Sequence, residues 1–177
     1  MKVLDKKFRL YITEGKILSR VKRLGTQISY DLVGKNPLLV VNLNGAMVFG
    51  VDLHRSITIP SELTTIRLKS YVGTKSTGEI KTIMPLQEDI VGRTVVIVED
   101  IVDSGATIQA IVQQMKDLGA ADVRIATLLF KKEACKIENL PLDYVGFEIP
   151  NKFVVGYGLD YNGYGRNLRD IFIPAKE

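Results

Sequence analysis

The residues best suited to chemistry lie in one segment, from Val95 to Thr107, which reads Val-Val-Ile-Val-Glu-Asp-Ile-Val-Asp-Ser-Gly-Ala-Thr. Its first four residues are apolar, which is typical of a central parallel strand covered on both faces. Two adjacent carboxylates, Glu99 and Asp100, follow the apolar run, and a short polar turn then leads into a helix. Open α/β sheets bind ligands beyond the carboxyl ends of their strands, so we expect a ligand at this turn.

The turn suits a phosphate group. Gly105 allows the backbone to come close, Ser104 and Thr107 offer hydroxyls, and the amides at the start of the helix carry partial positive charge. The two carboxylates before the turn would repel a phosphate, but they suit hydroxyl groups or a Mg²⁺ ion, which prefers oxygen ligands. The segment therefore predicts a ligand that combines a phosphate, a diol and a metal.

A plainer interpretation stays open at this point. Loops after strands are often acidic, and Asp103 could cap the helix instead of acting on a ligand. Composition alone does not separate this interpretation from ligand binding. The order of the residues favours the ligand.

That order resembles the phosphoribosyl-pyrophosphate signature of type I phosphoribosyltransferases: four apolar residues, two acids, two apolar residues, then Asp, Ser or Thr, Gly and Thr. Neither the P-loop pattern nor the glycine pattern of dinucleotide folds occurs in the chain. Two further segments resemble hypoxanthine-guanine phosphoribosyltransferases. Arg67–Tyr71 with Ser76–Ile80 is similar to their mobile catalytic loop, and Asp143–Tyr161 is similar to their purine-binding hood. The resemblance runs in the family's order from about Leu38 to about Ile173.

The resemblance implies roles for the first segment. Glu99, Asp100 and Asp103 would lie along the phosphoribosyl group, the first two facing the ribose hydroxyls and Mg²⁺. Asp103 would accept the N7 proton of the purine as the bond to the ribose forms, and its charge would stabilise a transition state of oxocarbenium character. The 5′-phosphate would be held by the turn residues Ser104, Gly105, Ala106 and Thr107.

The resemblance also implies a purine site. Lys131 would donate to the 6-oxo group, which selects oxopurines over adenine, and Phe153 would stack on the ring. The backbone of Val154 would read the base edge, with Lys152 beside it. Asp160 would hold a second Mg²⁺, and its backbone would meet a 2-amino group. Without the family, Lys131 would be interpreted as a solvated lysine and Phe153 as a core aromatic.

A third set of residues is implied for pyrophosphate and for closure. Arg166 would bind pyrophosphate, for which a guanidinium is well suited, and Ser70 and Tyr71 would enter with the mobile loop and help to exclude water. Asn44-Gly45, preceded by leucine, stands where the family usually has Leu-Lys-Gly, whose backbone binds pyrophosphate through a cis peptide. The backbone donors are kept, but the lysine charge is missing.

Hydrophobic periodicity supplies the framework for these residues. Helices are expected between Thr13 and Gly34 and at 46–54 and 106–118, with strands at 38–41, 64–71, 94–98 and 123–130 and a polar loop or hairpin tip at 73–81. This alternation predicts an α/β fold with a doubly wound, mostly parallel sheet. The resemblance makes it the type I phosphoribosyltransferase fold: one domain over 1–177, with a core at about 36–131 and a hood at about 1–12 and 140–177.

The composition narrows the classes of function. The net charge of +4 comes from scattered basic residues with no basic stripe, so no nucleic-acid partner is expected. One cysteine and one histidine exclude an internal disulfide and a zinc site built on a histidine pair. No apolar run approaches the ~20 residues of a membrane span, and the N-terminal segment lacks the apolar core of a signal peptide. We therefore expect a cytoplasmic protein with no membrane partner.

The resulting hypothesis is a purine-salvage enzyme. It would use Mg²⁺ and phosphoribosyl pyrophosphate to convert hypoxanthine or guanine into IMP or GMP, releasing pyrophosphate. A xanthine-preferring transferase and a nucleotide-sensing regulator on the same fold remain alternatives, although the sequence has no added DNA-binding segment to favour the regulator. The resemblance also implies a homodimer or a homotetramer.

Overall fold

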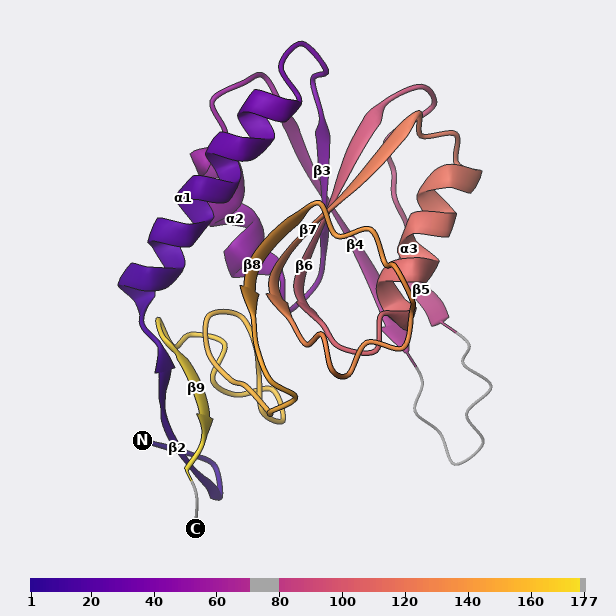
Figure 1. Cartoon of the computed structure of the whole chain (residues 1–177). Coiled ribbons are helices and arrows are strands. Elements are labelled where there is room, and N and C mark those ends of the chain that lie inside the picture. Colours follow the sequence, from indigo (N-terminus) through magenta and orange to yellow (C-terminus); the bar gives the residue numbers. More distant parts are fainter. Residues whose placement is uncertain (71–79, 176–177) are drawn as a thin grey trace.

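A six-stranded sheet forms the centre of the molecule, in the order β5-β4-β3-β6-β7-β8 (Figure 1). The computed structural model describes residues 1–70 and 80–175. All strands run parallel except β5, which pairs antiparallel with β4 at one edge. The bounds are β3 Leu38–Asn42, β4 Glu62–Ser70, β5 Ile80–Met84, β6 Thr94–Val102, β7 Asp122–Phe130 and β8 Tyr144–Glu148. The predicted fold class is therefore confirmed.

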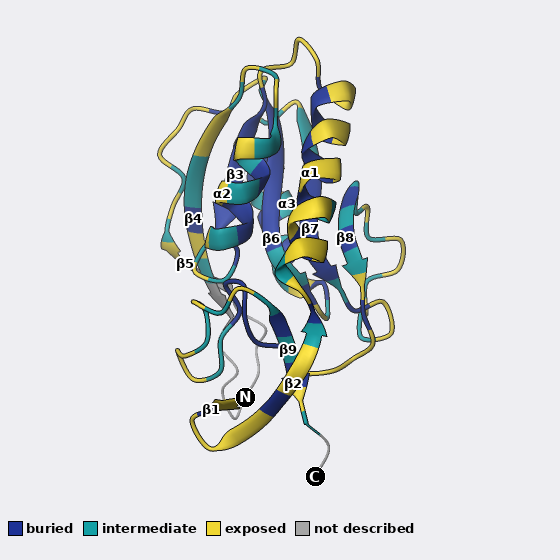
Figure 2. Cartoon of the chain, turned by 90° about the vertical axis from the view of Figure 1, so that its left-hand side faces the viewer, coloured by how far each residue is buried: buried dark blue, intermediate teal, exposed yellow. Residues whose placement is uncertain are grey.

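Helices cover both faces of the sheet. Helices α1 (Glu14–Asp31) and α2 (Met47–Ser56) lie on one face, and α3 (Ala106–Asp117) lies on the other (Figure 1). Strand β3 contributes side chains to the hydrophobic cores on both faces of the sheet, because alternate residues of a strand point to opposite faces. Leu39 and Val41 pack in the core with α1 and α2, whereas Leu38 and Val40 pack in the core with α3. The central strands are accordingly buried, while the outer side of α1 is exposed (Figure 2). Within the described residues, no helix is long and apolar enough to cross a membrane.

Helix α1 begins where the sequence predicts. The Thr13 side chain accepts a hydrogen bond from the Lys16 amide at 3.5 Å, and the acidic Glu14 lies in the first turn. A carboxylate from the far end of the chain, Asp170, accepts from the Glu14 amide at 2.7 Å. Side-chain oxygen atoms of the protein thus accept hydrogen bonds from two of the backbone N–H groups that have no partner within the helix at this end. Its apolar stripe is buried: Ile17, Val21, Leu24 and Ile28.

A small second sheet forms the hood and joins the two ends of the chain. It consists of β1 (Lys2–Val3), β2 (Lys6–Ile12) and β9 (Ile171–Pro174), with β2 antiparallel to both neighbours. Strands β2 and β9, which come from opposite ends of the chain, therefore lie side by side (Figure 1). A separate apolar cluster of Val3, Phe8 and Val155 holds the hood together.

The expected boundary between core and hood needs a correction at β8. The prediction places all of residues 140–177 in the hood, but β8 pairs in parallel with β7 and is an edge strand of the main sheet. Helix α1 also packs into the main core, although the predicted core began only at about residue 36. The hood therefore comprises the residues after Glu148 together with the first two strands.

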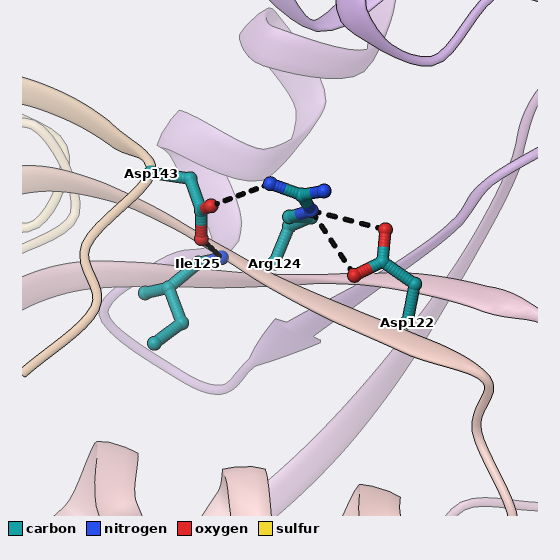
Figure 3. A network of polar contacts seen from close by, with 4 residues as sticks. All are labelled: Asp122, Arg124, Ile125 and Asp143. Carbon is teal, nitrogen blue, oxygen red and sulfur yellow. Dashed lines mark hydrogen bonds and ion pairs between the residues drawn. The ribbon is translucent and has the colours of Figure 1, made fainter.

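An arginine fixes the amino end of β7 (Figure 3). The Arg124 guanidinium contacts Asp122 at 3.0 Å and Asp143 at 3.0 Å, and the second oxygen of Asp143 accepts from the Ile125 amide at 2.9 Å. The hydrogen bond with Asp122, and then that with Asp143, raise the pKa of Arg124. This network attaches the segment that enters β8 to the start of β7.

Candidate active site

Strand β6 carries the two adjacent acids within the sheet, which corrects the expectation of a strand ending at Val98. The strand continues to Val102 because β7 supplies ladder partners along this whole length. Glu99 is buried, with 6% of its surface exposed, and its Oε2 accepts a hydrogen bond from Nδ2 of Asn42 at 2.9 Å. Asp100 is partly buried and accepts from the Ile101 amide at 2.8 Å.

The carboxylates of Glu99 and Asp100 influence each other's pKa. Burial raises the pKa of Glu99 well above its usual range, the charge of Asp100 raises it further, and the hydrogen bond from Asn42 acts in the opposite direction. Burial also raises the pKa of Asp100, while its contact with Glu99, the Ile101 amide and the charge of Arg166 lower it. Carboxylates placed this way are poorly solvated, so hydroxyl donors or a cation at this position would stabilise their charged forms.

A pocket of about 80 Å³ opens beside the turn between β6 and α3. Its lining includes the predicted phosphate residues Ser104, Gly105 and Thr107 together with Glu99 and Asp103. In contrast to α1, helix α3 begins with neither a side-chain cap nor an acidic residue in its first turn. The amides of this turn are therefore available to an anionic ligand.

Gly105 is required at the start of α3 for two reasons. Its φ is +87°, a conformation that L side chains rarely adopt, and a Cβ there would lie 2.9 Å from Cγ1 of Ile137. The Ala106 amide is 3.5 Å from the Ser104 hydroxyl, so the turn is already curled toward the helix start. Because Gly105 is the N-cap residue, the alternative in which Asp103 caps the helix is wrong.

Asp103 instead pairs with Lys131. The Lys131 ammonium lies 2.9 Å from Oδ2 of Asp103, although the two residues are 28 positions apart. Lys131 follows β7, its amide donates to the Val102 carbonyl at 2.9 Å, and only 7% of its surface is exposed. The buried ammonium of Lys131 and the half-exposed carboxylate of Asp103 thus place opposite charges side by side at the rim of the pocket. Because Lys131 is buried, the plainer interpretation of it as a solvated lysine is wrong.

The hood presents Phe153 at the surface. It is 46% exposed, and Phe8 and Tyr161 support it with ring centroids 6.3 and 5.8 Å away. An aromatic ring held from behind and open to solvent can stack on a planar base. Val154 is buried next to it, directly before the bridge between Val155 and Phe172, whereas Lys152 is exposed.

The predicted pyrophosphate residues gather at one corner. The peptide bond between Leu43 and Asn44 is cis, as the resemblance implied. A methyl group added at Gly45 would overlap the Asp100 carboxylate, and one added at Gly158 would overlap the Gly45 carbonyl, so three segments meet here with no room for side chains.

The two charged residues of this corner contact each other. The Arg166 guanidinium lies 2.6 Å from Oδ1 of Asp160 and donates to the Gly158 carbonyl at 2.7 Å. The other carboxylate oxygen of Asp160 accepts from the Gly163 amide at 2.7 Å. For Asp160 to reach a metal, or Arg166 a pyrophosphate, this pair must separate or share its ligand.

The predicted loop residues can be placed only in part. Ser70 is the last residue of β4, at the base of the β4–β5 hairpin. Tyr71 lies outside the described residues.

Sequence reasoning missed Asn42. This residue is the hydrogen-bond partner of Glu99 and is 7% exposed. The signal was present, because Asn42 is the one polar residue at the end of the apolar run 38–41 and a buried amide requires partners. The pattern did not indicate which partners these were.

Comparison with known proteins identifies the family of this chain. Residues 11–162 match the phosphoribosyl transferase domain family. The chain is 41% identical over 170 residues to a hypoxanthine-guanine phosphoribosyltransferase of Streptococcus pneumoniae, covering 96% of this chain and 94% of the relative. It is also 41% identical over 169 residues to the enzyme of that name from Lactococcus lactis, covering 94% and 91%. A crystal structure of a hypoxanthine phosphoribosyltransferase from Staphylococcus aureus superposes with a TM-score of 0.90 at 36% identity, covering 97% of this chain and 92% of the other.

The chain therefore belongs to the phosphoribosyltransferase family. The relatives named above are hypoxanthine-guanine members of that family, which is the branch that the three sequence motifs resemble. The predictions of family, fold class and an enzyme of purine salvage are confirmed.

Proposed function

We propose that this enzyme transfers the 5-phosphoribosyl group of phosphoribosyl pyrophosphate to N9 of hypoxanthine or guanine, giving IMP or GMP and pyrophosphate. The contact that carries the proposal is the pair of Asp103 and Lys131, 2.9 Å apart at the rim of the phosphate turn. In a 6-oxopurine, N7 and the 6-oxo group are neighbours. A carboxylate and an ammonium held side by side can therefore accept the N7 proton and donate to the oxygen together.

Each bond change then has a residue beside it. The bond from C1′ to the pyrophosphate oxygen breaks, the bond from C1′ to N9 forms, and the N7 proton passes to the Asp103 carboxylate. Glu99 and Asp100 bind the ribose hydroxyls, and their charge stabilises the oxocarbenium character that develops on the ring. The turn Ser104–Thr107 binds the 5′-phosphate with its backbone amides and hydroxyls, which fixes the reacting carbon against the base.

The residues at the other corner bind the leaving group and the base. Arg166 holds the departing pyrophosphate, helped by the backbone at Asn44 and Gly45. Phe153 stacks on the purine, and the Val154 backbone reads its edge beside Lys152. The resemblance to the family implies that Ser70 and Tyr71 would enter with the loop and exclude water that would intercept the activated ribose; Tyr71 lies outside the described residues.

The donor set fits Mg²⁺. This ion is typically bound by one or two carboxylates together with substrate phosphates and water, and no group of three or more metal-binding side chains occurs among the described residues. Glu99 and Asp100 supply carboxylates from β6, and Asp160 supplies one from the hood. When bound, Mg²⁺ neutralises charge on the pyrophosphate leaving group.

The base preference is expected to depend on Lys131. Its ammonium can only donate, so it favours a 6-oxo group and disfavours the 6-amino group of adenine. Xanthine also carries the 6-oxo group, which keeps a xanthine preference as the second candidate. The pair with Asp103 does not favour a nucleotide-sensing regulator, because sensing a finished nucleotide needs no group to accept the N7 proton.

The test is a turnover assay with purified protein, Mg²⁺, phosphoribosyl pyrophosphate and hypoxanthine, guanine, xanthine or adenine, followed by ultraviolet absorbance. We expect turnover with hypoxanthine and guanine and none with adenine. Lys131→Met should lower kcat/KM for hypoxanthine by about 100-fold, because a buried charged donor is lost. Lys132→Met, the same change at the exposed neighbour, should leave it unchanged. Absence of turnover with every purine would refute the proposal.

Two properties outside the site are also proposed. A homodimer or homotetramer is supported by the family and by the exposed Met47 and Val51 on α2, and light scattering of the purified protein tests it. A cytoplasmic location is supported by the single cysteine, Cys135, which is free.

A further inference from the structure

Asn42 is a buried polar residue to which the chemistry above assigns no role. It is the last residue of β3 and is 7% exposed, after four apolar residues of the same strand. Burying an amide costs free energy unless both of its ends find partners. Here Oδ1 accepts from the Leu68 amide at 3.3 Å, and Nδ2 donates to Oε2 of Glu99 at 2.9 Å.

The chemistry of the two partners fixes the direction of the Asn42 amide. The backbone N–H of Leu68 can only donate, so it requires the side-chain oxygen. The nitrogen of Asn42 then faces Glu99, where it can only donate to the carboxylate. A hydrogen bond to an ionised acceptor is stronger than one between neutral groups. An apolar residue at position 42 would leave both partners without this contact.

The contact with Leu68 extends the sheet beyond the end of β3. The β3–β4 ladder ends with the pair of Asn42 and Ile66, and the β4–β5 pairing shifts its register between Arg67 and Leu68. The side chain of Asn42 supplies the acceptor that the strand no longer provides. One side chain thereby joins β4 on one side to Glu99 of β6 on the other.

We infer that Asn42 is a positioning residue, which holds the Glu99 carboxylate in the orientation that accepts hydrogen bonds from the ribose hydroxyls of the nucleotide. This inference rests on the proposed function. Asn42 acts through Glu99: with Oε2 anchored at 2.9 Å, the terminal bond of the glutamate cannot rotate freely, and its remaining lone pairs keep a fixed direction.

The direct test compares a nucleotide with and without its ribose hydroxyls. Calorimetry would measure the binding of GMP and of 2′,3′-dideoxy-GMP to the wild type and to Asn42→Leu, which has a similar volume and no amide. We expect Asn42→Leu to weaken GMP about 10-fold and the dideoxy nucleotide less than about 2-fold, since only GMP engages Glu99 through hydroxyls. A purely structural role for Asn42 would weaken both nucleotides equally, and that result would overturn the inference.

Asn42→Asp separates the two contacts. Aspartate keeps an acceptor for the Leu68 amide but loses the donor to Glu99 and adds a like charge. It should therefore lose GMP affinity at least as strongly as Asn42→Leu. Recovery of GMP binding in this variant would show that the Leu68 contact alone matters, which contradicts the inference. This variant also serves if Asn42→Leu does not fold, as judged by its thermal unfolding.

A double-mutant cycle with Glu99→Gln completes the test. If Asn42 acts through Glu99, Asn42→Leu in the Glu99→Gln background should cause little further loss of GMP affinity. Additive losses would overturn the inference. A wild type that does not bind GMP at all would overturn the proposed function first, and the inference with it. Normal wild-type binding with equal losses for both nucleotides would overturn the inference alone.

Discussion

The two ends of the main sheet both carry clustered acids, but the two clusters are built differently. At the amino end of β7, Asp122 and Asp143 are both paired with Arg124 (Figure 3). At the carboxyl end of β6, the buried Glu99 lies next to the partly buried Asp100. Among described residues of other strands, Glu99 has only the neutral amide of Asn42 as a hydrogen-bond partner. In the first cluster, both acids lie 3.0 Å from a cation of the protein, the shared Arg124 guanidinium. Among the described residues, no cation forms an ion pair with Glu99 or Asp100, although the charge of Arg166 lowers the pKa of Asp100. An acid pair of that kind favours ligands that bring hydroxyls or a metal ion.

The largest effect in this comparison is expected for Asp103→Asn at the carboxyl end. The amide still accepts from Lys131, but it cannot take the N7 proton, so kcat should fall about 10²- to 10⁴-fold while GMP affinity stays within about 2-fold. Steady-state kinetics and calorimetry measure the two quantities. Asp122→Asn makes the same change at the amino end and should leave kcat as it is. Near-normal turnover of Asp103→Asn would mean that Asp103 is not the proton acceptor.

A smaller effect, confined to stability, is expected for Asp143→Ala. The variant removes the acceptor of the Ile125 amide and one partner of Arg124, which is itself 43% exposed on its side chain. We expect a loss of about 1–2 kcal/mol in the free energy of unfolding, mostly from the backbone hydrogen bond, since exposed ion pairs contribute little. Urea denaturation measures this loss. GMP affinity should not change, and a clear loss of it would mean that the two ends of the sheet are coupled.

The smallest effect is expected in the pH dependence of stability. Because burial raises the pKa of Glu99 above that of the unfolded chain, the folded state binds the proton more tightly. Stability should therefore fall as pH rises from about 4.5 through the raised pKa, since the unfolded state binds fewer protons in this window. Glu99→Gln should remove the part of this fall that Glu99 causes, while the raised pKa of Asp100 keeps its own part, so the stability of the variant relative to the wild type should grow with pH. Urea denaturation between pH 4.5 and 7.5 measures it, with the exposed Glu138→Gln as control; parallel profiles for the wild type and Glu99→Gln would contradict it.

The sequence predicted the turn between β6 and α3 because the geometry of this turn is local. Gly105, Ser104 and Thr107 lie within four residues of one another, and a strand, a turn and a helix start place them together without help from distant segments. The strand itself was predicted too short. A pattern of apolar residues stops at Glu99, but the ladder continues because β7 offers partners to Ile101 and Val102 as well.

The pairs that cross the fold could not be read from spacing. Asp103 meets Lys131 only because β6 and β7 are neighbours in the sheet, and Asn42 meets Glu99 only because β3 and β6 are. The boundary at β8 failed for a related reason. Its aromatic content resembles that of the hood, whereas its place in the main sheet is set by parallel pairing with β7.

The pairing of β2 with β9 also sets the order in which the molecule can be completed during its synthesis. Residues Leu38–Phe130 hold the central strands and can associate as they leave the ribosome, whereas β2 must wait for Ile171–Pro174 to emerge before the hood sheet closes. Phe8, which supports Phe153 from behind, lies on the waiting strand. The turn proposed to bind phosphate can therefore form on a nascent chain, while the hood face proposed to hold the purine is assembled last.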